Sequence, residues 1–313
     1  MPYVESYRDA STHQMMLEDV VRTSSYERAI KQQVGSESKV LDFGAGTGVL
    51  SIFAARAGAQ RVDAIERSSF VEHARRIAHD SGYPEIEFHH ADHLTYQSEH
   101  KADVLVSEWM GHCLFYEAML EPLITLRERF LAPDGVMIPA RVSVHAALVT
   151  DESFHDERAF FLGSPYGIDF SSIAEEPLRQ NRRVRLQAHQ LDAHRFVLAD
   201  LDMKEIAKTP PCLSASGHVH QAAMAYGFAA WFRTELTSEV SFGTGPDDPS
   251  THWDQLLFPF PEPVVIVPDR TVTIELCPPR QAEDEDPTWA WSFSDGEQTI
   301  CVDEHDTFFD PHD

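Results

Sequence analysis

The sequence predicts an α/β fold in two parts: a doubly wound parallel sheet preceded by helices, and then an all-β domain. In residues 35–139, short β-rich runs alternate with segments of helical periodicity, the order in which helices cover both faces of a parallel sheet. From residue 140 onward, strand-like runs follow one another between Pro, Gly and Asp turns. We therefore expect helices over 1–34, an α/β domain over 35–139 and a β domain over 140–313.

The elements of the first two parts follow from the spacing of apolar residues and from turn signals. Apolar residues recur with helical spacing in two N-terminal stretches, 5–17 and 19–33. In the α/β part we expect strands at 39–43, 61–66, 86–90, 102–107 and 136–139, and helices at 49–56, 69–79 and 116–130.

The last part of the chain has the alternating pattern of antiparallel strands. We expect strands at 142–149, 184–189, 196–201, 218–228, 256–260, 264–268, 271–277, 288–293 and 298–302. The stretch 152–176 is rich in aromatic residues and fits neither period, so we expect it to leave the β domain as an excursion.

Charge and composition exclude several classes of protein. The 313 residues include 25 basic and 51 acidic side chains, and a net charge of −26 repels nucleic acid and anionic membranes but attracts a basic partner. No apolar run reaches the roughly 18 residues of a membrane span, so we expect no membrane partner and a cytoplasmic location. The four cysteines are scattered without a CxxC pair, which indicates neither a disulfide framework nor a thiolate zinc site and favours a reducing compartment.

A glycine turn joins the first predicted strand to its helix. Gly44, Gly46 and Gly48 allow a sharp turn and let a ligand approach the start of the helix, whose free N–H groups favour an anionic group. Glu66 ends the next strand about 20 residues on, where a carboxylate reaches ribose hydroxyls. The pattern is GxGxG rather than GxGxxG, so we expect S-adenosylmethionine rather than NAD. Asp42 precedes this turn and could add polar contacts.

Histidines and acids cluster at positions 89–93, after the strand at 86–90. Imidazole and carboxylate groups are zinc ligands, but adjacent residues on a strand point to opposite faces, so His89 and His90 do not converge. We predict no metal site, and we place the adenine ring of a nucleoside near Asp92 and His93.

Two glutamates follow the strand at 102–107, Glu108 and Glu117, on either side of Gly111. A loop can bring both carboxylates to one point at the carboxyl edge of the sheet, where ligands bind. Such a pair could perform glycosidase acid/base chemistry, bind a metal ion, or hold a planar cation through paired hydrogen bonds.

The stretches VLDFGAGTGVLSIFAARAGAQRVDAIERS and SEWMGHCLFYEAML resemble the protein arginine methyltransferase family. The similarity continues upstream, in Tyr3-Val4-Glu5-Ser6-Tyr7, and downstream, in Thr251-His252-Trp253 and Tyr166-Gly167-Ile168-Asp169. It runs in order over almost the whole chain. Tyr3-Val4 stands where members have a Tyr-Phe pair, and His93 where many have a Glu near the adenine.

The resemblance implies a Rossmann-like doubly wound sheet with N-terminal helices, then a β-barrel domain whose arm, around 152–176, forms a homodimer. It implies S-adenosylmethionine as cofactor and methyl transfer to the guanidino nitrogen of arginine in a basic protein or peptide. By resemblance, Glu108 and Glu117 clamp the guanidinium, His252 with Asp19 accepts the proton, and Tyr7, Met119 and Trp253 contact substrate. The cofactor-binding residues it implies are Tyr7, His13, Met16, Arg22, Asp42, Gly44, Gly46, Glu66, Asp92, His93 and Glu108. Met16 and Met119 resemble members that make asymmetric dimethylarginine.

Two other functions fit parts of this pattern. A methyltransferase of the same fold could act on a small guanidine or amine. A non-catalytic protein could use the acidic surface to bind basic partners, although a scaffold has no need of the glutamate pair.

Overall fold

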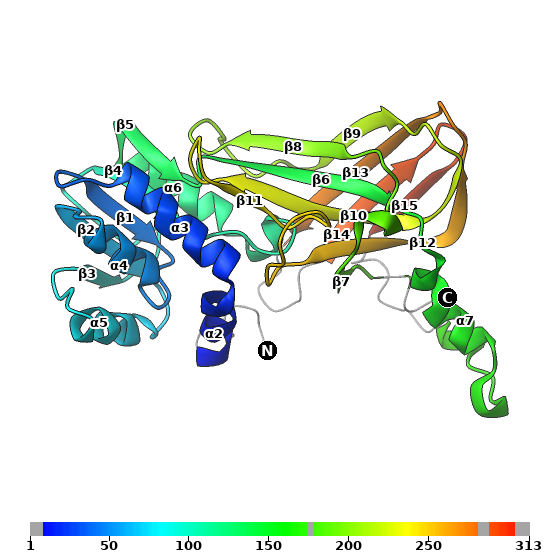
Figure 1. The fold of residues 1–313 in the computed structure, drawn as a ribbon, viewed down its shortest axis with the longest axis horizontal. Helices are drawn as coiled ribbons and strands as arrows, with labels where there is room; N and C mark the ends of the chain where they lie inside the picture. Colours follow the sequence, from blue (N-terminus) through cyan, green and yellow to red (C-terminus); the bar gives the residue numbers. More distant parts are fainter. Residues whose placement is uncertain (1–8, 175–177, 179, 281–287, 304–313) are drawn as a thin grey trace.

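The computed structural model describes residues 9–174, 178, 180–280 and 288–303. The α/β part lies at one end of an elongated molecule and the β domain at the other (Figure 1). Helices α2 and α3 lie beside the parallel sheet, on the side that faces the rest of the molecule.

Two capped helices open the described chain. Helix α2, Ala10–Glu18, begins after Asp9, whose carboxylate accepts the backbone N–H of Ser11. Helix α3, Val20–Gln33, begins after Asp19, whose Oδ1 accepts the N–H of Arg22 at 2.9 Å. Such caps satisfy amide groups that have no partner within the helix. Asp19 is thereby fixed between the two helices.

The α/β part contains a five-stranded, all-parallel sheet in the order β3-β2-β1-β4-β5. Its strands are β1 Lys39–Phe43, β2 Arg61–Glu66, β3 Glu87–His90, β4 Ala102–Ser107 and β5 Leu131–Ile138. Its helices are α4 Val49–Arg56, α5 Val71–Asp80 and α6 Leu120–Phe130. The strand order reverses between β1 and β4, and in open parallel sheets ligands bind at this switch point, outside the carboxyl ends of the strands.

The second part is built from two antiparallel sheets. The six-stranded sheet has the order β7-β12-β10-β6-β8, with β11 paired to β10, and the four-stranded sheet has the order β15-β14-β13-β9. The strands are β6 Arg141–Val149, β7 Arg182–Val184, β8 Phe196–Asp202, β9 Leu213–His218, β10 Ala223–Glu235, β11 Ser241–Gly243, β12 Gln255–Ile266, β13 Thr271–Arg280, β14 Thr288–Ser294 and β15 Thr299–Asp303. The core contains the rings of Phe228, Phe258, Phe260 and Trp291. This is the predicted C-terminal barrel domain.

The predicted excursion at 152–176 projects from the β domain (Figure 1). Its described part contains helix α7, Asp156–Leu162, and short 3₁₀ turns at Glu152–His155, Pro165–Gly167 and Ser171–Ile173. Large apolar side chains along it are exposed: Phe160, Leu162, Tyr166, Ile168 and Ile173. Exposed apolar groups gathered on one segment are typical of a surface that another chain covers.

Several predicted elements differ in extent from those of the structure. The helix expected at 116–130 begins at Leu120, because Ala118 has a φ of 48° and interrupts it after a 3₁₀ turn. The strands expected at 256–260 and 264–268 form one strand, β12. The strand expected at 184–189 was wrong, because β7 ends at Val184 and a 3₁₀ turn follows at Ala188–Gln190. Strands β9 and β11 were not expected.

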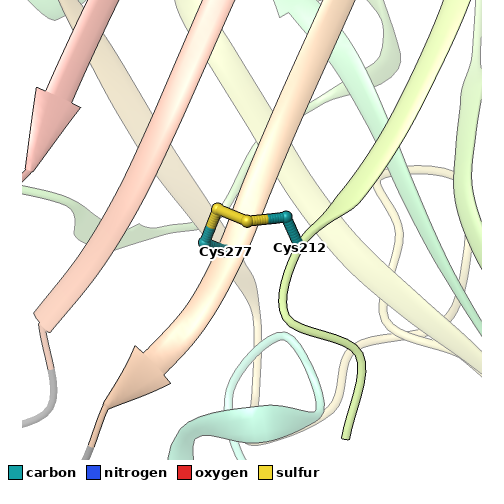
Figure 2. Close-up of a disulfide and its surroundings, with 2 residues drawn as sticks. All are labelled: Cys212 and Cys277. Carbon is teal, nitrogen blue, oxygen red and sulfur yellow. A yellow bond between two sulfur atoms is a disulfide. The ribbon is translucent and has the colours of Figure 1, made fainter.

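A disulfide joins Cys212 to Cys277, which corrects the expectation that the cysteines form none (Figure 2). The two residues lie 65 apart in the sequence, so their spacing gives no hint of contact. Strand β9 pairs with β13 in antiparallel register, and Leu213 lies opposite Leu276. Continued by one residue, this register places Cys212 opposite Cys277. Cys113 is buried and Cys301 is exposed, and both are free thiols.

Among the described residues, no helix is long and apolar enough to cross a membrane.

Candidate active site

One cavity of about 420 Å³ lies at the carboxyl ends of the parallel strands, beneath α2. It lies next to the switch point of the sheet, as expected for a ligand site in this architecture. The predicted site residues that line it are His13, Met16, Arg22, Gly44, Gly46, Glu66, Asp92, His93, Glu108, Glu117 and Met119. Tyr7 lies outside the described residues.

The glycine turn forms one wall of the cavity together with Glu66. Gly44 and Gly46 have positive φ angles of 75° and 54°, which glycine adopts without strain. A Cβ on Gly46 would lie 3.2 Å from the imidazole of His13, so the turn has room for glycine only. Glu66 accepts the N–H of Gly46 at 3.0 Å through Oε2 and the N–H of Ser68 at 2.7 Å through Oε1. These bonds fix its carboxylate at the end of β2.

Asp42 lies under the turn and does not line the cavity. Its Oδ2 accepts the hydroxyl of Ser51 at 2.6 Å, while its buried Oδ1 has no hydrogen-bond partner among the described residues. Burial raises the pKa of Asp42 to about 7, because a charge there loses its hydration. Asp42 therefore contacts helix α4 rather than the open space.

Arg22 and Glu108 form a buried ion pair across the cavity. Nε and Nη2 of Arg22 donate to Oε2 of Glu108 at 2.9 and 2.7 Å, and Nη1 donates to the carbonyl of Met16 at 3.1 Å. The side chains are only 7% and 8% exposed. This pair orients Glu108, whose Oε1 accepts one hydrogen bond from the described residues, from the N–H of Met110 at 3.2 Å.

The loop that carries both glutamates, residues 108–117, is folded back on itself. Gly111 and Leu114 exchange two backbone hydrogen bonds of 3.0 Å, and Cys113 and Leu114 have positive φ angles of 49° and 71°. A Cβ on Gly111 would lie 2.7 Å from Cγ of Glu117, so the chain at Gly111 packs directly against Glu117. This turn returns Glu117 to the cavity that Glu108 also lines. We call this segment the glutamate loop.

Asp19 and His252 form a second buried pair, at the contact between the two parts of the molecule. Oδ2 of Asp19 accepts from Nδ1 of His252 at 2.8 Å and from its backbone N–H at 2.9 Å. Burial of Asp19 opposes its ionisation, but the hydrogen bonds from His252 and Arg22 outweigh it and hold its pKa below the ordinary value. Neither residue lines the cavity itself.

Trp253 anchors the glutamate loop. Its Nε1 donates to the carbonyl of Met110 at 2.8 Å, and its own carbonyl accepts from Nδ1 of His112 at 2.9 Å. The ring is buried and stacks on Phe242 at 5.9 Å, so it faces the domain contact and not the cavity. His112 and Met110 are supporting residues that the sequence reasoning missed, because nothing in their spacing pairs them with Trp253.

Asp92 and His93 also line the cavity, directly after strand β3. Oδ1 of Asp92 accepts the N–H groups of Leu94 and Thr95 at 2.9 and 2.7 Å, which hold the turn after β3. Ser68, which also lines the cavity, was missed, although its position directly after Glu66 at a strand end could have indicated it.

The histidines near residue 90 diverge, as predicted. Nε2 of His89 contacts Oδ1 of Asp63 at 2.8 Å, and Nε2 of His90 donates to the carbonyl of Arg67 at 3.1 Å. Asp63, Glu87 and His89 bring ligand-type atoms within 4.8 Å of one another, but Arg61 bonds to both carboxylates. Both carboxylates therefore already have a cationic hydrogen-bond partner in Arg61.

Comparison with known proteins gives the same assignment. Residues 140–296 match the arginine methyltransferase oligomerization subdomain, and residues 35–188 match a methyltransferase domain. Protein arginine N-methyltransferase 1 of Schizosaccharomyces pombe is 33% identical over 272 residues, covering 82% of this chain and 78% of the relative. The chain belongs to the protein arginine N-methyltransferase family.

Other family members agree over most of their length. Protein arginine N-methyltransferase 1 of Caenorhabditis elegans is 29% identical over 295 residues, 90% of this chain and 85% of the relative. The solved Trypanosoma brucei PRMT1 enzyme–prozyme heterotetramer with AdoHcy has a TM-score of 0.82 at 26% identity, covering 95% of this chain and 98% of that one. These findings confirm the predicted family, fold, enzyme class and S-adenosylmethionine cofactor. They also identify an oligomerization subdomain in the β part.

Proposed function

We propose that this protein methylates arginine side chains of basic proteins or peptides in the cavity that Glu108 and Glu117 line. The observation that carries the proposal is that one cavity joins a glycine turn with its strand-end carboxylate, Glu66, to the glutamate loop. A cofactor site and a cation site thus share one enclosed space.

The cavity fits the cofactor in size and in donors. Its volume of about 420 Å³ lies within the range of sites for small ligands. Gly44 and Gly46 allow close backbone approach, and we assign the fixed carboxylate of Glu66 to the ribose hydroxyls. We assign Arg22 to the cofactor carboxylate and Asp92 and His93 to the adenine end. When bound, S-adenosylmethionine supplies an electrophilic methyl group on a sulfonium.

The glutamates act on the substrate guanidinium. The pKa of this group lies far above neutral pH, so it stays protonated, and its charge is delocalised, which makes each nitrogen a poor nucleophile. Glu108 and Glu117 hold two edges of the planar cation and draw positive charge away from the nitrogen that reacts. Holding the cation in line also removes much of the entropic barrier.

We assign proton acceptance to His252. Its Nδ1 donates to the ionised Asp19, which fixes the tautomer and leaves Nε2 as the acceptor. The lowered pKa of Asp19 keeps that carboxylate charged, so it can hold the ring in this orientation.

For the remaining features we retain the proposals drawn from the sequence. The domains are 1–34, 35–139 and 140–313, the arm mediates a homodimer, and the location is cytoplasmic. Tyr7 and Met119 shape the pocket with Trp253 behind them, and the resemblance in Met16 and Met119 favours asymmetric dimethylarginine as product.

Glu108→Gln tests the clamp because it keeps the shape and removes one charge. We expect turnover on an arginine-rich peptide to fall by about 10²-fold or more, while S-adenosylhomocysteine still binds in calorimetry. Glu128→Gln, an exposed acid on α6, is the matched control. Near-normal turnover in Glu108→Gln would refute the clamp, and activity on free arginine alone would favour a small-molecule substrate.

A further inference from the structure

Two exposed arginines, one on strand β7 and one directly after its end, lie on the surface of this very acidic protein. The side chains of Arg183 and Arg185 are 52% and 54% exposed. Nε of Arg183 lies 3.8 Å from Oδ2 of Asp254, and Nη1 of Arg185 lies 3.9 Å from Oδ1 of the same residue. Among the described residues, Asp254 is the acid that both arginines contact. Arg185 also donates to the hydroxyl of Ser250. Two guanidinium groups share one carboxylate, so these three side chains together carry a net positive charge. We call Arg183 and Arg185 the β7 arginine pair.

The backbone aims the pair away from its neighbour Arg182. Successive strand residues point to opposite faces. Arg182 donates to the carbonyl of Phe154, and Val184 packs against a small apolar cluster on the same face. Arg183 therefore points to the other face, and Arg185, directly after the strand, reaches the same carboxylate of Asp254. Asp254 has a φ of 52°, an uncommon value for a residue with a side chain, and this turn places its carboxylate within reach of both arginines.

The pair is close to the glutamate loop. In the pairing of β7 with β12, Val184 lies opposite Gln255, so the pair flanks the chain directly after Trp253. Trp253 in turn contacts Met110 and His112 of the glutamate loop at 2.8 and 2.9 Å. Trp253 and Asp254, which are adjacent in sequence, thus connect the arginines to the loop that carries Glu108 and Glu117.

The charge of Arg183 is felt within the glutamate loop. The pKa of His112 is lowered, first by burial and further by repulsion from Arg183. The same positive charge would attract an anionic side chain of a substrate that binds near this loop.

We propose that Arg183 and Arg185 form a subsite for an acidic side chain of the substrate, a few residues from the arginine that is methylated. The inference rests on the proposed function. An extended peptide advances about 3.3–3.6 Å per residue, so a glutamate within about five positions of the target can reach beyond the loop. The overall charge of −26 attracts a basic chain at long range. The β7 arginine pair would then favour the position of the bound peptide in which an acidic side chain contacts the pair.

The test compares glycine-rich peptides with a single arginine and either Glu or Gln at each of the five positions on either side. For the best position we expect kcat/KM about three- to tenfold higher with Glu than with Gln. The difference should appear mainly in KM, because a remote contact is equal in ground and transition states. It should shrink in about 1 M salt, where the Debye length is about 3 Å.

Variants separate the pair from general electrostatics. In Arg183→Gln/Arg185→Gln the Glu/Gln ratio should fall to about one, and in Arg183→Glu/Arg185→Glu it should fall below one. Arg76→Gln, an exposed arginine on α5, should keep the ratio. A Glu/Gln ratio near one at every position in the wild type would overturn the subsite. So would a wild-type Glu/Gln ratio that stays unchanged in both double variants. If no peptide is methylated although S-adenosylhomocysteine binds, the proposed function fails and the subsite falls with it.

Discussion

Single buried side chains set the chemistry of the cavity. Arg22 and Glu108 stand 86 residues apart in sequence, yet two hydrogen bonds from one guanidinium orient the carboxylate that we assign to the substrate. Asp42 is the contrasting case, a buried acid with one carboxylate oxygen that has no hydrogen-bond partner among the described residues.

Asp42 makes the stability of the fold depend on pH. An unfolded Asp titrates near pH 4, but burial raises the pKa of Asp42 to about 7. Between these values the folded protein keeps a proton that the unfolded chain has lost, so this contribution is complete below about pH 4 and is lost as pH rises through about 7. Relative to Asp42→Asn, we expect the free energy of unfolding of the wild type to fall by about 2–3 kcal/mol from pH 5 to pH 8.

Urea unfolding of both proteins at several pH values measures this difference. Parallel pH profiles for wild type and Asp42→Asn would show that Asp42 is ionised throughout.

Gly111 positions Glu117 without touching the substrate. In Gly111→Ala the new Cβ would lie 2.7 Å from Cγ and 2.9 Å from the backbone nitrogen of Glu117, so the loop must shift. We expect kcat to fall by about 10²-fold, since a displacement of about 1 Å can cost that much, while the affinity for S-adenosylhomocysteine is kept. Gly35→Ala is the control, because nothing lies within 4 Å of its Cβ. Unchanged kcat in Gly111→Ala would separate Glu117 from catalysis.

At the scale of elements, the bounds of helices and strands are predicted most accurately where the periodic spacing of apolar residues is unbroken. Strands β1, β2 and β4 and helix α4 have the predicted bounds, because apolar runs end at glycine or charged turns. Strand β9, Leu213–His218, was missed because its Ser, Ala and Gly residues have little β-propensity, and pairing with β13 provides its order.

Much of the cavity lining could be predicted from the sequence. Motif positions place Glu66 and Glu108 at or directly after strand ends and Glu117 in the loop that follows, and a parallel sheet brings these positions to one edge. The pairing of Asp19 with His252 was expected from the family resemblance and is present in the structure. The bond from Trp253 to Met110 was not expected, because it joins the β domain to the glutamate loop and no local spacing indicates such a contact.

The disulfide between β9 and β13 should stabilise the β domain. Closing a loop of this length restricts the unfolded chain, so we expect Cys212→Ser/Cys277→Ser to lower the free energy of unfolding by about 2–4 kcal/mol. A reducing agent should destabilise the wild type and Cys301→Ser equally and leave the double variant unchanged. If reduction does not alter wild-type unfolding in urea, the two thiols are not bonded in solution.

At the scale of the whole molecule, the site depends on how the β domain is placed. His252 and Trp253 come from the β domain, and their partners Asp19 and Met110 come from the N-terminal helices and the glutamate loop. A hydrogen bond of 2.9 Å from Thr237 to Gln32 on α3 adds to the same contact. The groups that we assign to catalysis are thus aligned by the packing of the β domain against the rest of the molecule.

The exposed arm should determine the oligomeric state. Phe160 and Ile168 are 57% and 54% exposed on a segment that projects from the β domain. We expect Phe160→Asp/Ile168→Asp to convert a dimer into a monomer, because burying two carboxylates in an interface is costly. Light scattering after gel filtration measures the mass. Val197→Asp, 51% exposed on β8, should remain dimeric. A double variant that stays dimeric would place the interface elsewhere.

The central claim is that the two-glutamate cavity transfers methyl groups to arginine. Mass spectrometry of a glycine- and arginine-rich peptide incubated with the protein and S-adenosylmethionine tests it most directly, with Glu108→Gln as control. The account predicts gains of one or two methyl units located on arginine in the wild type, and almost none with the variant. Equal gains with both proteins, or no gain from a wild type that binds S-adenosylhomocysteine, would contradict it.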